Sequence, residues 1–111
     1  MIARIWQCWA TRENADQYEH TLCSKIIPQI LAKNIQGLHA IELMRRDVED
    51  EVEFMTIFRF ENVDQIKAMA GDDAEAAYVP EIARKILSRF DERARHFESR
   101  GDVMDTAGAS Q

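Results

Sequence analysis

Two histidines and two arginines are the side chains whose types and positions suit proton and charge chemistry. His39 and His96 each stand in a strand-like stretch, and an imidazole titrates near neutral pH, so either could accept a proton. Arg4 and Arg59 each stand in an otherwise apolar stretch, where a guanidinium could stabilise an anion. The aromatic residues that could wall an apolar slot beside them are Trp6, Phe58 and Tyr78. Such a set could remove a proton from a small compound and hold the anion that remains.

Each of these residues also has a structural explanation. A histidine in a strand commonly makes structural hydrogen bonds or lies at a dimer interface, and a tryptophan such as Trp6 commonly belongs to the core. Arg4 and Arg59 could instead pair with carboxylates across a sheet. The carboxylates available for such pairs are Glu42, Glu53 and Glu98. The sequence leaves the functional and the structural interpretations open.

The sequence contains no motif for binding a metal ion or a nucleotide. No pair of histidines, cysteines or carboxylates has the spacing of a metal site, and the acidic runs 49–51 and 72–73 are typical of solvated turns. No glycine-rich loop is present that could hold a phosphate group. We therefore expect neither a metal nor a cofactor.

Composition restricts the class of protein. A chain of 111 residues with 31% charged residues fits one domain, and its net charge of −6 repels nucleic acid. No apolar run approaches the roughly 20 residues of a membrane span, and the start lacks the pattern of a signal peptide, so we expect a cytoplasmic protein with no membrane partner. Cys8 and Cys23 would then be free thiols.

The hydrophobic period predicts a first strand followed by a long helical segment. Ile2 to Trp9 reads as a strand, and Thr11 suits the N-cap of a helix whose apolar stripe is Ala15, Tyr18, Leu22 and Ile26. Pro28 disfavours a straight continuation. We therefore expect residues 28–34 to form a kinked last turn or a loop that ends near Gly37.

The remaining elements follow from the same signals. Residues 38–46 and 51–60 predict a hairpin, Asn62 and Gln65 suit a capping box, and Gly71 should end the helix that they begin. A further helix should begin near Pro80, with its apolar stripe running through Phe90. A last strand is expected over residues 93–99. Residues 101–111 should form a flexible tail.

This order predicts an α+β fold of the ferredoxin-like, split βαβ type, with a four-stranded antiparallel sheet and both helical crossovers on one face. Large apolar side chains occupy both parities of the first and third strands, so the second face would also be apolar. A second copy would cover that face, which predicts a homodimer.

Several segments resemble the antibiotic biosynthesis monooxygenase family, and the likeness spans a domain of about residues 1–100. The segments that carry it are residues 2–6, 11–16 with Tyr18, 51–56, 79–81, 87–93 and 96–98. The resemblance implies a dimeric α+β barrel in which two four-stranded sheets face each other and the helices lie outside.

The resemblance also implies candidate activities. Some members oxygenate aromatic compounds without metal or flavin, and a chain of that kind would act on a small aromatic or quinone-like compound. For this activity His96 and His39 are the candidate bases and Arg59 and Arg4 the candidate anion holders. The alternative is a non-catalytic dimeric barrel that binds a small molecule or serves as an assembly module.

The haem-degrading branch of the family fits poorly. Those members use a histidine in the second helical region, a tryptophan after the third strand and an asparagine in the first strand. This chain has no histidine between His39 and His96, no tryptophan after Trp9 and no asparagine before Asn14.

Overall fold

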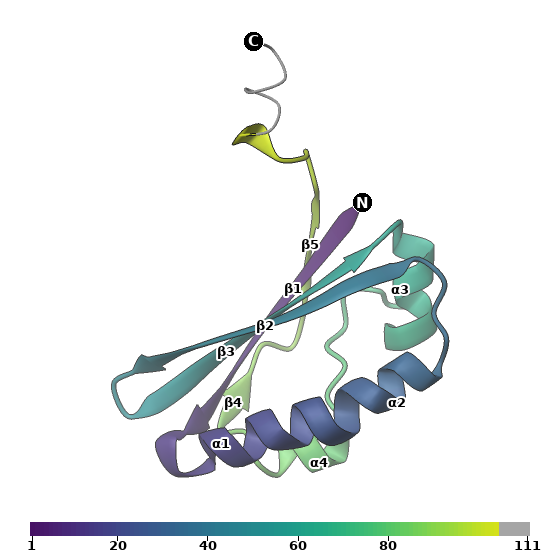
Figure 1. The fold of residues 1–111 in the computed structure, drawn as a ribbon. Coiled ribbons are helices and arrows are strands. Elements are labelled where there is room, and N and C mark those ends of the chain that lie inside the picture. Colours follow the sequence, from purple (N-terminus) through teal and green to yellow (C-terminus); the bar gives the residue numbers. More distant parts are fainter. Residues whose placement is uncertain (105–111) are drawn as a thin grey trace.

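The computed structural model describes residues 1–104, and Figure 1 shows one twisted sheet with the helices along one of its faces. The greater part of the expected tail, residues 105–111, lies outside the described residues. The elements, in chain order, are β1 (Ile2–Thr11), α1 (Arg12–Thr21), the π-helical segment η1 (Leu22–Ile26), α2 (Ile27–Ala32), β2 (Leu38–Val48), β3 (Glu51–Phe60), α3 (Val63–Ala70), α4 (Glu81–Arg84), β4 (Arg89–Phe90) and β5 (Arg95–Glu98).

The sheet is antiparallel with the order β2-β3-β1-β4, and β5 also pairs with β1. This order is compatible with the expected ferredoxin-like fold. The expected last strand is found as β5, but the edge of the sheet beside β1 is divided into two short strands instead of one. The residues between β4 and β5 pair with another segment, because Ala94 N donates to Glu75 O and Ala77 N donates to Glu92 O.

Alternation along the strands decides which side chains meet the helices. The even-numbered residues of β1 and β3 face the helical layer, and the two strands pair in register, with Arg4 opposite Phe58 and Trp6 opposite Thr56. Buried side chains of this face form the core with Tyr18 and Ile30 from the helical segment. The core therefore lies between one face of the sheet and the helices.

The first helical segment begins as expected but continues further. Thr11 is the N-cap of α1, and its Oγ1 accepts a hydrogen bond from Asn14 N at 3.2 Å. The helix runs through Pro28 to Ala32, so the alternative of a loop over residues 28–34 is wrong for most of its length. The wider turn of η1 ends at Ile26, two residues before Pro28, and such a turn accommodates a residue that lacks a backbone N–H.

The hairpin and the capping arrangement are confirmed. β2 and β3 pair from Leu38 and Phe60 to Val48 and Glu51, with one bulge at His39. Gln65 Oε1 accepts hydrogen bonds from the backbone N–H groups of Glu61 and Asn62 at the start of α3. Gly71 ends α3 with a φ of 92°, a conformation that favours glycine.

The helix expected from Pro80 onward is far shorter than its apolar pattern indicates. α4 covers only Glu81–Arg84. Ser88 N donates to Trp9 O at 2.8 Å and Asp91 N donates to Gln7 O at 3.0 Å. The backbone after α4 therefore satisfies the carbonyl groups at the edge of β1, and a helix through Phe90 would leave these carbonyls without those donors.

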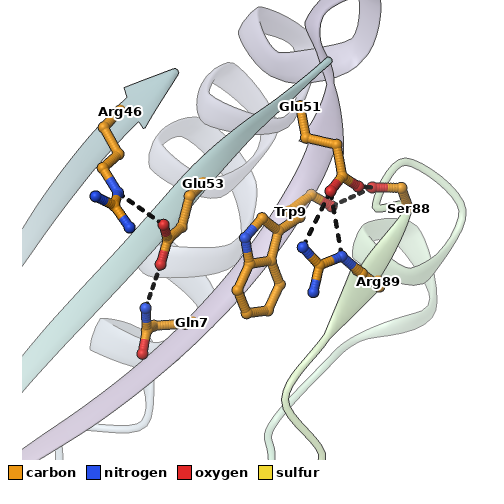
Figure 2. Close-up of polar contacts among 7 residues, drawn as sticks. All are labelled: Gln7, Trp9, Arg46, Glu51, Glu53, Ser88 and Arg89. Carbon is orange, nitrogen blue, oxygen red and sulfur yellow. Dashed lines mark hydrogen bonds and ion pairs between the residues drawn. The ribbon is translucent and has the colours of Figure 1, made fainter. Parts of the chain in front are cut away.

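The other face of the sheet carries no helix and is mixed in character. Ile5, Met55 and Ile57 are half-buried there, and Phe97 is 51% exposed. Polar side chains cross the same face: Figure 2 shows Glu53 between Gln7 and Arg46, with Arg46 Nε 2.8 Å from Glu53 Oε1. We call this surface the open face. Its side chains are less apolar than the alternation of residues in the first and third strands predicts.

Candidate functional site

A narrow cavity lies between the sheet and the helical layer. Its floor comes from β1 and β3, one wall from α1, η1 and α2, and the opposite wall from residues 78–83. Its volume is about 40 Å³, which has room for water molecules but not for an aromatic ring. The lining residues that matter for chemistry are Arg4, Trp6, Tyr18, Thr56, Phe58 and Tyr78.

Aromatic side chains make most of the floor and walls rigid. Trp6 Nε1 donates to Asp91 O at 2.6 Å, which fixes the indole against the segment between β4 and β5. Tyr18 is buried, and its ring stands edge-on to Phe54 with the centroids 4.9 Å apart. Burial raises the pKa of Tyr18, and it raises the pKa of the neighbouring Cys8 thiol to about 12. These two groups are therefore neutral parts of the core at physiological pH.

The helical wall owes its shape to η1. Leu22 and Ile26 begin and end this π-helical segment, and both side chains are buried and line the cavity. Ile30 lines it from α2. The wall is therefore apolar along its length, and the wide turn lies directly beside the cavity, a place where such turns are often found.

Arg4 brings a positive charge into this apolar site. The side chain is only 3% exposed, and it donates through Nη1 to Ala74 O and through Nη2 to Ala76 O at 2.7 Å. Burial lowers the pKa of Arg4 to about 10, and the charge of Glu75 opposes that change. Arg4 therefore remains a cation at neutral pH.

Two of the donor hydrogens of Arg4 are left for a ligand. A guanidinium carries five N–H donors, and three of them are directed at Ala74, Ala76 and His96. Its Nε–H and one Nη2–H make no hydrogen bond within residues 1–104. Because Arg4 lines the cavity, it could donate to an oxygen that enters there.

His96 acts on Arg4 and does not line the cavity. Its Nε2 lies 2.9 Å from Nη1 of Arg4, and because a guanidinium only donates, we assign Nε2 as the acceptor and place the ring proton on Nδ1. Burial and the charge of Arg4 both lower the pKa of His96. The basic nitrogen of this histidine is therefore already occupied by Arg4.

The structure brings four of the expected site residues together at one cavity and separates two others from it. The four are Arg4, Trp6, Phe58 and Tyr78. His39 is exposed and lies with Nε2 3.0 Å from Glu61 Oε1. Arg59 lies on the open face, opposite Ala3 and Ala40, and makes no ion pair within residues 1–104.

The carboxylate pairs suggested for the two arginines are not formed. Arg4 binds backbone carbonyls and His96, while Glu53 pairs with Arg46 and Glu98 pairs with Arg100. For Arg4, register excludes Glu42 and Glu53, because both carboxylates lie on the open face and Arg4 lies on the helical face.

Thr56 is one of the lining residues that sequence reasoning missed. It is 5% exposed, and its hydroxyl makes no hydrogen bond within residues 1–104. A signal was present, because Thr56 is the one polar residue in the row of even-numbered β3 positions from Val52 to Phe60. A single polar residue in a row that faces the core marks a polar position in an apolar site.

Comparison with known proteins does not identify a family. No protein-family model matches the chain, and no curated protein matches it. Within residues 1–104, no group of three or more histidine, cysteine, aspartate or glutamate side chains is placed to hold a metal ion, and no helix is long and apolar enough to cross a membrane. The case for a function therefore rests on the cavity.

Proposed function

We propose that this protein binds a small aromatic or quinone-like compound through an ionised oxygen in the cavity at Arg4, and that it oxygenates this compound without a cofactor. The single observation that carries the binding proposal is Arg4, a buried cation with two uncommitted donors among aromatic walls. An apolar pocket with a few convergent polar groups is the common form of a small-molecule site. The oxygenase step rests on the resemblance of residues 1–100 to the antibiotic biosynthesis monooxygenases.

The chemistry that Arg4 could supply is stabilisation of an anion. A phenol or enol bound at the guanidinium would ionise more readily, because an opposite charge nearby favours the charged form. The electron-rich anion could then reduce molecular oxygen. For an anthrone-like methylene, the balanced reaction converts CH₂ and O₂ into C=O and H₂O, with one oxygen atom entering the product and the other leaving as water.

The cavity has to widen before a ring can enter. The cavity as it stands has room only for water molecules, whereas small-molecule pockets commonly measure about 300 to 1,000 Å³. Tyr78 is half-buried in the irregular segment between α3 and α4, and Lys33 Nζ lies 4.8 Å from the centroid of its ring. We therefore assign the opening movement to Tyr78 and the wall beside it.

Oxygen uptake and ligand binding test this proposal with matched variants. Uptake is measured with a panel of anthrones and hydroquinones, with the spontaneous rate subtracted, and binding of 2-hydroxy-1,4-naphthoquinone is followed by calorimetry. Tyr78→Ala removes a ring of the cavity wall that contacts the ligand. This variant should therefore raise the dissociation constant about tenfold. Arg59→Ala lies on the open face and should leave binding unchanged.

Two outcomes would count against the proposal. If no compound of the panel binds to the wild-type protein, the cavity is not a binding site for this class. If Arg59→Ala weakens binding and Tyr78→Ala does not, the ligand lies on the open face instead.

Non-catalytic binding is the second candidate function, and one observation favours it. The basic nitrogen of His96 faces Arg4, so no histidine with a free acceptor lines the cavity within residues 1–104. A binding protein needs no base. Tight binding of 2-hydroxy-1,4-naphthoquinone without oxygen uptake for any compound of the panel would favour this function.

We also propose that the open face binds a second copy of the chain. Half-buried Ile5, Met55 and Ile57 and exposed Phe97 support a contact there. Charges on the same face are available for a partner, because Arg59 and Glu42 form no ion pair within residues 1–104. Their opposite signs suit a twofold contact, in which each residue of one protomer can meet the other residue of the partner.

A further inference from the structure

The hydroxyl of Thr56 makes no hydrogen bond within residues 1–104, and it is not a fully buried atom, because no fully buried side-chain oxygen of these residues lacks a partner. Its side chain points from β3 to the helical face and lines the cavity, with 5% of the residue exposed. Valine has nearly the same shape, so the hydroxyl adds to this apolar row a polar group that can pair with a molecule inside the cavity. The hydroxyl is therefore available to a water molecule or to a ligand that displaces it from the cavity.

The position of Thr56 relative to Arg4 limits what that could be. Thr56 is opposite Trp6 and Arg4 is opposite Phe58, so Thr56 and Arg4 are diagonal neighbours on one face of the sheet. Diagonal positions are roughly 7 to 8 Å apart, and the Arg4 head group extends away from β3 toward Ala74 and Ala76. One oxygen atom cannot reach both groups at that separation, but two oxygens on opposite sides of a ring could.

We propose that Thr56 is a specificity-determining residue, which hydrogen-bonds a second oxygen across the ring from the oxygen bound by Arg4. The ligand class is then an aromatic compound with an acidic hydroxyl and a carbonyl or hydroxyl opposite it. This inference rests on the proposed binding function and adds a requirement to it. Sites that hydrogen-bond a ligand group reject analogues that lack the group, because their own polar atoms are then left unpaired.

The test compares two ligands of nearly equal shape on three proteins. 4-Hydroxyacetophenone carries a carbonyl oxygen opposite its hydroxyl, and 4-isopropenylphenol has a CH₂ group in place of that oxygen. Dissociation constants are measured by NMR titration for wild type, Thr56→Val and Thr56→Ser. The comparison across both ligands cancels their different acidity at Arg4.

We expect Thr56→Val to weaken binding of the ketone about fivefold and to leave the alkene unchanged, since a single neutral hydrogen bond is worth a factor of this order. Thr56→Ser should retain the preference for the ketone. Thermal unfolding of Thr56→Val should occur at the same or a higher temperature than in wild type, which a purely structural role for the hydroxyl would not give.

Each remaining outcome counts against one claim. If both ligands bind and Thr56→Val changes them equally or not at all, the role of Thr56 is overturned while the binding function stands. If neither ligand binds to the wild-type protein, the proposed binding function fails and the role of Thr56 with it.

Discussion

Arg4 and His96 form a pair in which each side chain sets the state of the other. The imidazole accepts from Nη1 at 2.9 Å, and the same guanidinium donates to Ala74 O and Ala76 O. The charge of Arg4 and the burial of the ring together oppose protonation of His96. His96 is therefore placed to position Arg4, and its expected role as a base stays a prediction.

This pair predicts a pH dependence of stability. The pKa of His96 is lowered below its ordinary value of 6.5, so the unfolded chain binds a proton that the folded protein resists. The free energy of unfolding should therefore fall as the pH drops below about 6.5. His96→Gln retains an acceptor toward Arg4 but cannot titrate, so urea unfolding between pH 7.5 and 5.5 should show a smaller loss for this variant.

Every other titratable group is the same in both proteins, so the comparison removes the contribution of these groups. Glu75 is the charged neighbour that opposes the shift at His96, and it is unchanged in the variant. Equal losses of stability for wild type and His96→Gln over this range would show that His96 does not carry the effect.

At the scale of elements, register and capping decide how the site is built. Pairing of β1 with β3 places Arg4, Trp6, Thr56 and Phe58 on one face, and the helix that starts at Thr11 supplies the wall opposite them. The start of that helix is fixed locally, because Thr11 Oγ1 accepts from Asn14 N. The position of the helical wall therefore depends in part on the hydrogen bond between Thr11 and Asn14 at the start of α1.

Thr11→Ala should lower the free energy of unfolding by about 1 kcal/mol, because the first turn of α1 loses its cap. Thr11→Ser retains the hydroxyl and should stay within a few tenths of a kcal/mol of wild type. Urea unfolding followed by circular dichroism measures both. An equal loss in the two variants would assign the effect to the methyl group of Thr11 and not to the cap.

Strand periodicity was enough to predict much of this arrangement, and the limits are physical. Alternation alone places Arg4 and Trp6 on a common face of the first strand, and the pairing of β1 with β3 brings Phe58 to the same face. The apolar spacing after Pro80 predicted a long helix, but hydrogen bonds from Ser88 and Asp91 to the edge of β1 prevail over that pattern. The Arg4 to His96 contact joins residues 92 positions apart, and no local pattern reveals it.

At the scale of the whole molecule, the two faces of the sheet have different roles. The helical face encloses the cavity, and the open face carries Ile5, Met55 and Ile57 with a polar row through Glu53 and Gln7 (Figure 2). A fixed polar row in an apolar contact restricts the relative placement of two copies, because each polar group already has its partner. The proposed dimer would therefore have one register.

Ile57→Lys should convert the proposed dimer into a monomer, because each copy would bring a charge into the shared apolar contact. Leu31→Lys is the matched control, since Leu31 is 54% exposed on α2 at the helical side. Light scattering at micromolar concentration should give twice the mass of the chain for wild type and for Leu31→Lys. A wild-type protein that is already monomeric would refute the dimer.

The narrowness of the cavity has a consequence for rates. An aromatic ring wider than the cavity can enter only after Tyr78 and the wall beside it have moved apart. The observed association rate should therefore rise with ligand concentration and then reach a plateau. That plateau is the opening frequency of the wall, and it is the same for every ligand that uses the entrance. Turnover could then never exceed this frequency, however reactive the bound compound is.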